Sequence, residues 1–167
     1  MLLGGCAPLP QPVPAPPTTV TSVETEVVLG PVRISGVVRG DAKLPADPAC
    51  TGSIQRFSLG GDYQGAVLAP GCVATADTPE NGDHGFYPTP PPRARTVQVA
   101  TPVGPATVFS NQYSECTSSC YIGSDEVALV TVDGVVVQII AVTAPASGTT
   151  ERNRNDLVQL LQSLRRG

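Results

Sequence analysis

One predicted hairpin constrains the fold of this chain more than any other segment. Residues 126–142 read EVALVTVDGVVVQIIAV, in which Asp133-Gly134 separates two runs of β-branched and apolar residues. Asp-Gly favours a two-residue type I′ turn, whose backbone twist matches that of the flanking strands. A turn of two residues also fixes the register of the strands. One face of the hairpin then pairs Val132 with Val135, Val130 with Val137, and Ala128 with Ile139.

The second face of this hairpin is also mostly apolar. Strands that are apolar on both faces belong in the middle of a layered structure, because a solvated edge would expose one of those faces. Another element must therefore cover the second face. Its pairs are Thr131 with Val136, Leu129 with Gln138, and Val127 with Ile140.

The C-terminal segment TTERNRNDLVQLLQSLRRG predicts an amphipathic helix that supplies this cover. Four leucines recur at the spacing i, i+3, i+4 and i+7, which forms one stripe on a helix. Thr150 is a suitable N-cap, and Arg165-Arg166 suit the negative end of the helix dipole. The leucines are Leu157, Leu160, Leu161 and Leu164.

Three further strand pairs are expected around Gly30-Pro31, Pro70-Gly71 and Pro102–Gly104. Seventeen glycines, 18 prolines and an aromatic content of 4% are typical of a turn-rich β protein. We therefore expect an α+β fold, with a mainly antiparallel, sandwich-like β-sheet and one C-terminal amphipathic helix packed on it. The paired segments are VETEVVL with VRISGVV, YQGAVLA with CVATA, and TVQVA with ATVFSNQYS.

The N-terminus, MLLGGCAPLPQPVPAPP, carries a resemblance to a known export signal. Leu3-Gly4-Gly5-Cys6 resembles the lipobox of bacterial lipoproteins, which implies that Cys6 becomes diacylated and N-terminal. A signal peptide needs an apolar region of 7–15 residues, and only residues 1–5 precede Cys6. We expect either a start upstream of Met1 or an unmodified cysteine on a free tail, and we favour the first.

The organisation that follows is a short anchor, a stalk and one domain. Residues 1–6 are the remnant of the signal peptide, and the Pro/Thr-rich residues 7–22 form a disordered tether. Alternating prolines favour polyproline II, so a dozen residues stand off by roughly 35–40 Å. Residues 23–167 form a single domain. No apolar run approaches the ~20 residues of a membrane-spanning helix.

The four remaining cysteines suit an exported protein with disulfide bonds. Four cysteines allow three pairings, and we expect Cys50–Cys72 and Cys116–Cys120 in an oxidising compartment. A four-thiolate zinc site is the alternative, but zinc ribbons use two close CxxC pairs. Cys116 and Cys120 could also form a redox pair, although no basic neighbour lowers the pKa of either thiol.

The long loop 77–93, DTPENGDHGFYPTPPPR, holds the weak candidates for chemistry. His84 is the only histidine of the chain, and no serine- or cysteine-hydrolase motif accompanies it. Asp77, Glu80 and Asp83 offer oxygen ligands to calcium, but without the EF-hand order. We therefore expect no catalytic residues, no metal and no cofactor.

The ends of the chain and its cysteines together resemble a known class of proteins. The lipobox, the tether, the paired cysteines and the ending TVDGVVVQIIAVTAP…LVQLLQSLRR resemble small actinobacterial envelope lipoproteins of unassigned function. The resemblance implies an extracytoplasmic protein that is lipid-anchored to the membrane, or secreted if Cys6 is not lipidated. The strand–strand–helix ending is also similar to PsbP-type α/β/α sandwiches.

These observations predict a non-enzymatic envelope lipoprotein, a binding or scaffolding module on a stalk. Its expected partners are the membrane, through Cys6, and an envelope protein or lipid. A net charge of −4 with few aromatic residues argues against nucleic acid. One alternative is a carrier of an apolar, lipid-like ligand between sheet and helix, in a pocket lined by Leu129, Ile140 and Leu160. A second alternative is an enzyme or metal site that uses the 77–93 loop.

Overall fold

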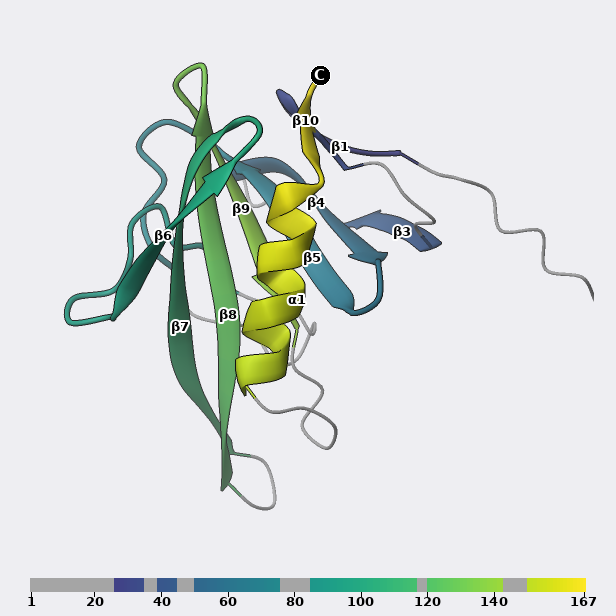
Figure 1. Ribbon diagram of the computed structural model, residues 1–167. Helices are drawn as coiled ribbons and strands as arrows, with labels where there is room; N and C mark the ends of the chain where they lie inside the picture. The colour runs from purple at the N-terminus through teal and green to yellow at the C-terminus, as the bar shows by residue number, and fades with distance from the viewer. Residues whose placement is uncertain (1–25, 35–38, 45–49, 76–84, 117–119, 143–149) are drawn as a thin grey trace, which may run out of the picture.

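Two antiparallel β-sheets and one helix form the described part of the chain (Figure 1). This computed structural model describes residues 26–34, 39–44, 50–75, 85–116, 120–142 and 150–167. The predicted α+β class is confirmed, because the strands are antiparallel and the single helix of these residues is C-terminal and packs on them.

The larger sheet has seven strands in the order β3-β4-β5-β9-β8-β7-β6. Each strand pairs antiparallel with its neighbours, and most connections are hairpins. The strands are β3 (Arg39–Leu44), β4 (Thr51–Ser58), β5 (Asp62–Leu68), β6 (Thr96–Thr101), β7 (Gly104–Cys116), β8 (Cys120–Val132) and β9 (Val135–Ala141).

The β8–β9 hairpin lies inside this sheet, as its sequence predicts. Asp133 and Gly134 both have positive φ angles, of 51° and 79°, which are the angles that a type I′ turn requires. The predicted register is confirmed at every pair, from Val132 opposite Val135 to Val127 opposite Ile140. A local turn signal therefore sets the central register of the sheet.

The smaller sheet has the order β1-β2-β10 and unites the two ends of the domain. The predicted pair around Gly30-Pro31 is confirmed over the residues that the structure describes there, and Gly30 adopts a φ of 56° in its turn. The strands are β1 (Val27–Leu29), β2 (Val32–Ile34) and β10 (Leu164–Arg166).

Strand β10 corrects the predicted end of the helix. Helix α1 (Thr150–Gln162) stops before Leu164, because Ser163 turns the chain with both its backbone N–H and its hydroxyl donating to the Leu160 carbonyl. Leu164 is buried, as expected, but it lies opposite Ile34 in the small sheet. Arg165-Arg166 belong to that strand, not to the helix end.

The helix covers the first face of the central hairpin, not the second face as the sequence suggests. Its three buried leucines share one cluster with Val130 and Ile139, which we call the helix-side cluster. The small sheet extends the same layer, and Leu29 packs so closely on Gly65 that a Cβ there would lie 2.5 Å from its Cδ1. The cluster comprises Val27, Leu29, Val32, Ile34, Phe57, Tyr63, Val103, Ala106, Val108, Ala128, Val130, Val132, Val137, Ile139, Ala141, Leu157, Leu160, Leu161 and Leu164.

Extended chain, rather than a second helix, covers the other face of the large sheet. Residues from the β5–β6 connection pack there against β8 and β9, in what we call the loop-side cluster. A second helical layer of the PsbP type is therefore not seen in the described part of the chain. The cluster comprises Cys50, Ile54, Ala66, Leu68, Cys72, Phe86, Tyr87, Phe109, Val127, Leu129 and Ile140.

One predicted hairpin is wrong and one is confirmed. The segment CVATA does not form a strand, since Cys72–Thr75 runs without regular structure after the Pro70-Gly71 turn. Strand β5 pairs instead with β4 and β9. The β6–β7 pair around Pro102–Gly104 forms as predicted.

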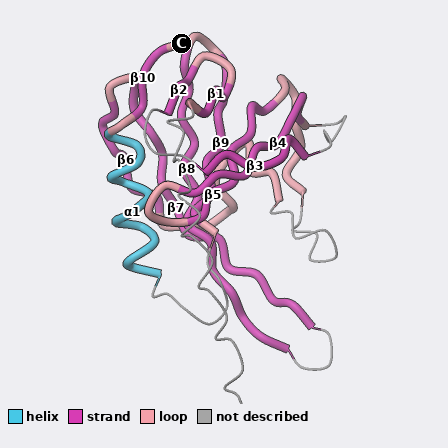
Figure 2. The backbone as a smooth tube through the Cα atoms, turned by 90° about the vertical axis from the view of Figure 1, so that its right-hand side faces the viewer, coloured by secondary structure: helices cyan, strands magenta, loops and turns pink. Residues whose placement is uncertain are grey.

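Strands β7 and β8 extend well beyond their neighbours. Figure 2 shows this hairpin projecting from the rest of the molecule. Strand β6 pairs with β7 only as far as Phe109, and β9 pairs with β8 only from Glu126 onward. The outer part of the hairpin is therefore a two-stranded ribbon. Within the described ranges, no helix has the length and apolar character needed to cross a bilayer.

The helix leucines should dominate the stability of the domain. Leu161 is fully buried, so Leu161→Ala should lower the free energy of unfolding by about 2–5 kcal/mol through lost burial and a residual cavity. Asn155→Ala, on the exposed side of the same helix, should change it by less than about 0.5 kcal/mol. Urea denaturation followed by circular dichroism measures both values, and equal effects would contradict the packing described.

Candidate functional site

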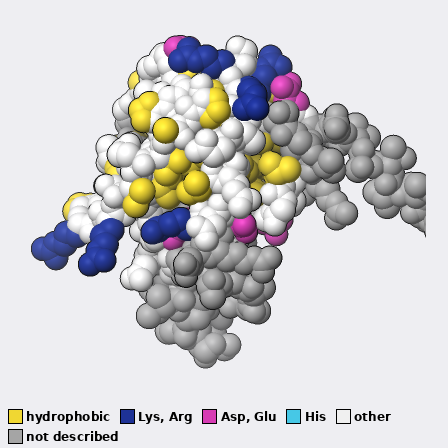
Figure 3. Space-filling model, viewed as in Figure 1, with side chains coloured by type: hydrophobic (Ala, Val, Ile, Leu, Met, Phe, Trp, Pro, Cys, Tyr) yellow, Lys and Arg dark blue, Asp and Glu magenta, His cyan; other side chains and the backbone are white. Residues whose placement is uncertain are grey.

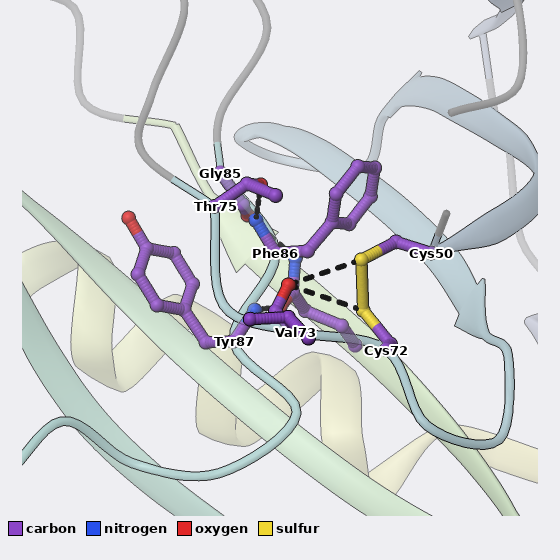
Figure 4. The surroundings of a disulfide bond; sticks show 8 residues. Cys50, Cys72, Val73, Thr75, Gly85, Phe86 and Tyr87 are labelled. Atoms are coloured by element: carbon purple, nitrogen blue, oxygen red, sulfur yellow. Dashed lines mark hydrogen bonds between the residues drawn. A yellow bond between two sulfur atoms is a disulfide. The ribbon is translucent and has the colours of Figure 1, made fainter. Parts of the chain in front are cut away.

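A buried disulfide bond fixes the chain that covers the loop side of the sheet. Cys50 and Cys72 are bonded, with their Cα atoms 4.5 Å apart, which confirms the first predicted pair (Figure 4). Both sulfur atoms contact the Val73 carbonyl oxygen, at 3.1 and 3.6 Å. The Ala69 N–H also donates to the Cys50 carbonyl at 2.6 Å. The start of β4 and the end of β5 are therefore joined both covalently and by hydrogen bonds.

The covering segment is held to the sheet by one buried amide. Gln138 accepts a hydrogen bond from the Tyr87 N–H at 2.7 Å and donates to the Gly85 carbonyl at 3.0 Å. The Thr75 N–H donates to the Phe86 carbonyl, and the Phe86 N–H donates to the Thr75 hydroxyl, each at 3.0 Å. Figure 4 shows Thr75 and Phe86 beside the disulfide. Gln138 is 1% exposed, so these bonds satisfy an amide that would otherwise be costly to bury.

The Tyr87 side chain adds a second attachment to the sheet. Its ring meets Phe109 edge-on, with centroids 6.2 Å apart, and its hydroxyl accepts a hydrogen bond from the Asn111 amide at 2.7 Å. Gln138 and Asn111 are the residues that sequence reasoning missed here. The available signal was a glutamine in the middle of VVVQIIA, a strand otherwise made of apolar residues.

An apolar cleft opens beside the disulfide. It has a volume of about 380 Å³ and lies between the Pro70-Gly71 turn and the β8–β9 turn. Among the described residues of its lining, no side chain is charged or can donate a strong hydrogen bond, since Cys72 is oxidised. A cleft of this size and polarity suits an uncharged apolar group. The lining residues are Val67, Leu68, Ala69, Pro70, Gly71, Cys72, Pro88, Gly134, Val135 and Val136.

A half-buried ion pair joins the start of the helix to the central strands. Arg154 Nε lies 2.7 Å from Glu126 Oε2, and the Glu126 side chain is fully buried. Ser110, opposite Glu126 on β7, donates to Glu126 Oε1 at 2.5 Å and accepts from Arg154 Nη2 at 2.7 Å. The sequence does not predict this pair, because Glu126 and Arg154 are 28 residues apart and only the fold brings them together.

The residues of the predicted carrier pocket do not converge. Leu129 and Ile140 belong to the loop-side cluster, whereas Leu160 belongs to the helix-side cluster. The large sheet separates the two groups, because adjacent residues of a strand point to opposite faces. The apolar cleft beside the disulfide lies elsewhere and uses none of these three side chains.

Several other predicted sites fall outside the described residues. These are Cys6, the weak calcium ligands Asp77, Glu80 and Asp83, and His84. The backbone register sets Cys116 directly opposite Cys120 at the end of the β7–β8 ribbon, and their bond stays a prediction. Among the side chains that the structure describes, no three histidine, cysteine or acidic groups cluster as metal ligands would.

Comparisons with protein families, with curated proteins and with solved structures found no match to this chain.

The Arg154–Glu126 pair should contribute measurably to stability. Arg154→Ala leaves a buried carboxylate without its cation, which costs 3–5 kcal/mol for a fully buried pair. Because the Arg154 side chain is 38% exposed, solvent screening should reduce this loss to about 1–3 kcal/mol. Urea denaturation at pH 7 measures the change.

A matched control is the exposed pair between Arg33 and Glu26, with side chains 43% and 44% exposed. Arg33→Ala should cost less than about 1 kcal/mol. Adding Glu126→Gln to the Arg154→Ala variant should recover part of the lost stability, since a neutral amide is cheaper to bury. Equal losses in the two arginine variants would show that Glu126 does not depend on Arg154.

Proposed function

We propose that this protein is an exported, lipid-anchored binding protein, and that its apolar cleft holds an uncharged apolar group of its ligand. The cleft itself is the observation that carries this proposal. It combines a volume of about 380 Å³ with a lining of apolar side chains and backbone. Ligand sites in proteins are mostly apolar and of similar volume.

The chemistry of the cleft favours binding over catalysis at this site. The lining residues that the structure describes offer no nucleophile, no general acid or base and no charged group. The surrounding frame is also rigid, because the disulfide and the Gln138 bonds fix the chain next to the cleft. A preformed cleft loses little conformational entropy when it is filled, which favours affinity.

The cysteine chemistry supports an extracytoplasmic location. Structural disulfides form and persist in oxidising compartments and are rare in the cytosol. The Cys50–Cys72 bond is buried, as a structural disulfide should be. Together with the lipobox resemblance and the proline-rich tether, it favours a domain held away from a membrane surface.

Filling the cleft should abolish binding of an apolar probe. Ala69 lines the cleft and is exposed, so Ala69→Trp should occupy the space without disturbing the core. The neutral fluorophore N-phenyl-1-naphthylamine should bind the unmodified domain, and its affinity should fall at least tenfold in this variant. Fluorescence titration at pH 7 measures both dissociation constants.

The control places the same side chain outside the cleft. Val73 is 73% exposed and is not part of the lining, so Val73→Trp should leave the probe's affinity unchanged. An equal loss in both variants would mean that the probe binds elsewhere. Native mass spectrometry of protein taken from its own envelope should also detect a bound apolar molecule, and a mass equal to that of the processed polypeptide alone would count against the proposal.

The anchor can be tested independently of the cleft. In a precursor that carries a signal peptide, Cys6→Ala should remove the acceptor of the lipid and shift the protein from the membrane fraction to the soluble extracytoplasmic fraction. Cys50→Ala, which removes a cysteine that the fold already uses, should leave the anchor intact. Continued recovery of the Cys6→Ala protein in membranes would refute lipid anchoring.

A further inference from the structure

A second cavity, of about 200 Å³, lies between helix α1 and the turn that joins β4 to β5. Unlike the apolar cleft, it is lined largely by polar side chains. Asp156 and Gln159 lie in the last turns of α1, Ser163 follows the helix end, and Tyr63 comes from β5. Leu59 and Leu160 complete the walls with apolar surface.

Tyr63 is the unusual member of this cavity. Its side chain is 2% exposed and its ring stacks on Phe57, with centroids 5.5 Å apart. Its hydroxyl lies at the β4–β5 turn, where a Cβ at Gly61 would come within 3.3 Å of it. The structure records no hydrogen bond between this hydroxyl and any described residue. Buried phenol hydroxyls usually have a partner, so this one is placed to meet a group that enters the cavity.

The cavity has a negative electrostatic character. Burial, together with the carboxylates of Asp156 and Asp62, raises the pKa of Tyr63 to about 12. The hydroxyl therefore stays neutral, and the two carboxylates favour a positive charge beside it. No lysine or arginine is among the described residues that line it. Figure 3 shows acidic side chains at the surface near the β4–β5 turn.

We propose that this cavity binds the ammonium group of a small primary amine. An ammonium group has three N–H donors and no acceptor. The Asp156 carboxylate, the Gln159 amide oxygen and the Tyr63 hydroxyl oxygen, all from residues that line the cavity, can each accept one of these bonds, and the carboxylate supplies the opposite charge. Leu59 and Leu160 would contact the carbon chain of the amine. Asp156 would repel an anion, and a neutral alcohol would gain the hydrogen bonds without the charge.

Three probes of nearly equal size separate these ligand classes. Propylammonium, 1-propanol and propionate are each titrated at pH 7, up to 20 mM, into the ¹⁵N-labelled unmodified protein, and its amide signals are followed by NMR. Propylammonium alone should cause saturable shifts in the amide signals of residues 59–63 and 156–163. Saturation by 1-propanol at the same concentration would overturn the charge requirement, and the lack of saturable shifts with any probe would overturn the site.

Two variants test the assigned groups. Asp156→Asn keeps the size of the side chain and should weaken propylammonium binding at least tenfold. Tyr63→Phe removes only the hydroxyl and should weaken it several-fold. Asn155→Ala, next to Asp156 on the exposed side of the helix, should have no effect. If Asp156→Asn binds propylammonium as tightly as the unmodified protein does, the carboxylate does not hold the ammonium and the proposal is wrong. The apolar cleft is not involved, so its probe should bind both variants normally.

Discussion

The burial of the β8–β9 hairpin on both faces is the constraint on which the rest of this structure depends. Within the hairpin segment 126–142 only Glu126 and the turn residue Asp133 carry charge, so each face needs its own covering layer. The helix and the small sheet cover one face, and the disulfide-bonded segment covers the other. The two cavities follow from this arrangement, because each lies where a covering layer meets an end or an edge of the large sheet.

The two layers are attached to the hairpin by different interactions. The helix layer is held by leucine packing, together with the Arg154–Glu126 ion pair. The loop layer has fewer aliphatic side chains and relies on a covalent bond and on the amide of Gln138. A segment without regular structure must satisfy its backbone groups individually, and a buried side-chain amide can serve one donor and one acceptor at once. The position of Gln138 in an apolar strand therefore has a structural reason.

Local signals in the sequence predicted the parts of the fold that local chemistry decides. Asp133-Gly134 determines a turn and hence a register, and the leucine spacing determines a helix. The side of the sheet on which the helix packs was predicted wrongly, because both faces of the hairpin are apolar and the choice depends on the distant strand β10. Strands β3 and β4 were missed because their sequences lack apolar alternation. The pairing of Cys50 with Cys72 was predictable, whereas the convergence of Tyr63 with Asp156 required the fold.

The length of the β7–β8 ribbon has a consequence for its cysteines. Beyond Phe109 and Glu126 no third strand of the described part pairs with either of the two, and an isolated pair of strands is barely stable in water. The pairing of such a ribbon would be lost first at its outer end. Cys116 and Cys120 lie opposite each other at that end, and residues so placed have Cα atoms about 4.5–5.5 Å apart, within the range of a disulfide. A disulfide bond between them would hold the two strands together at the end where their pairing would otherwise be lost first.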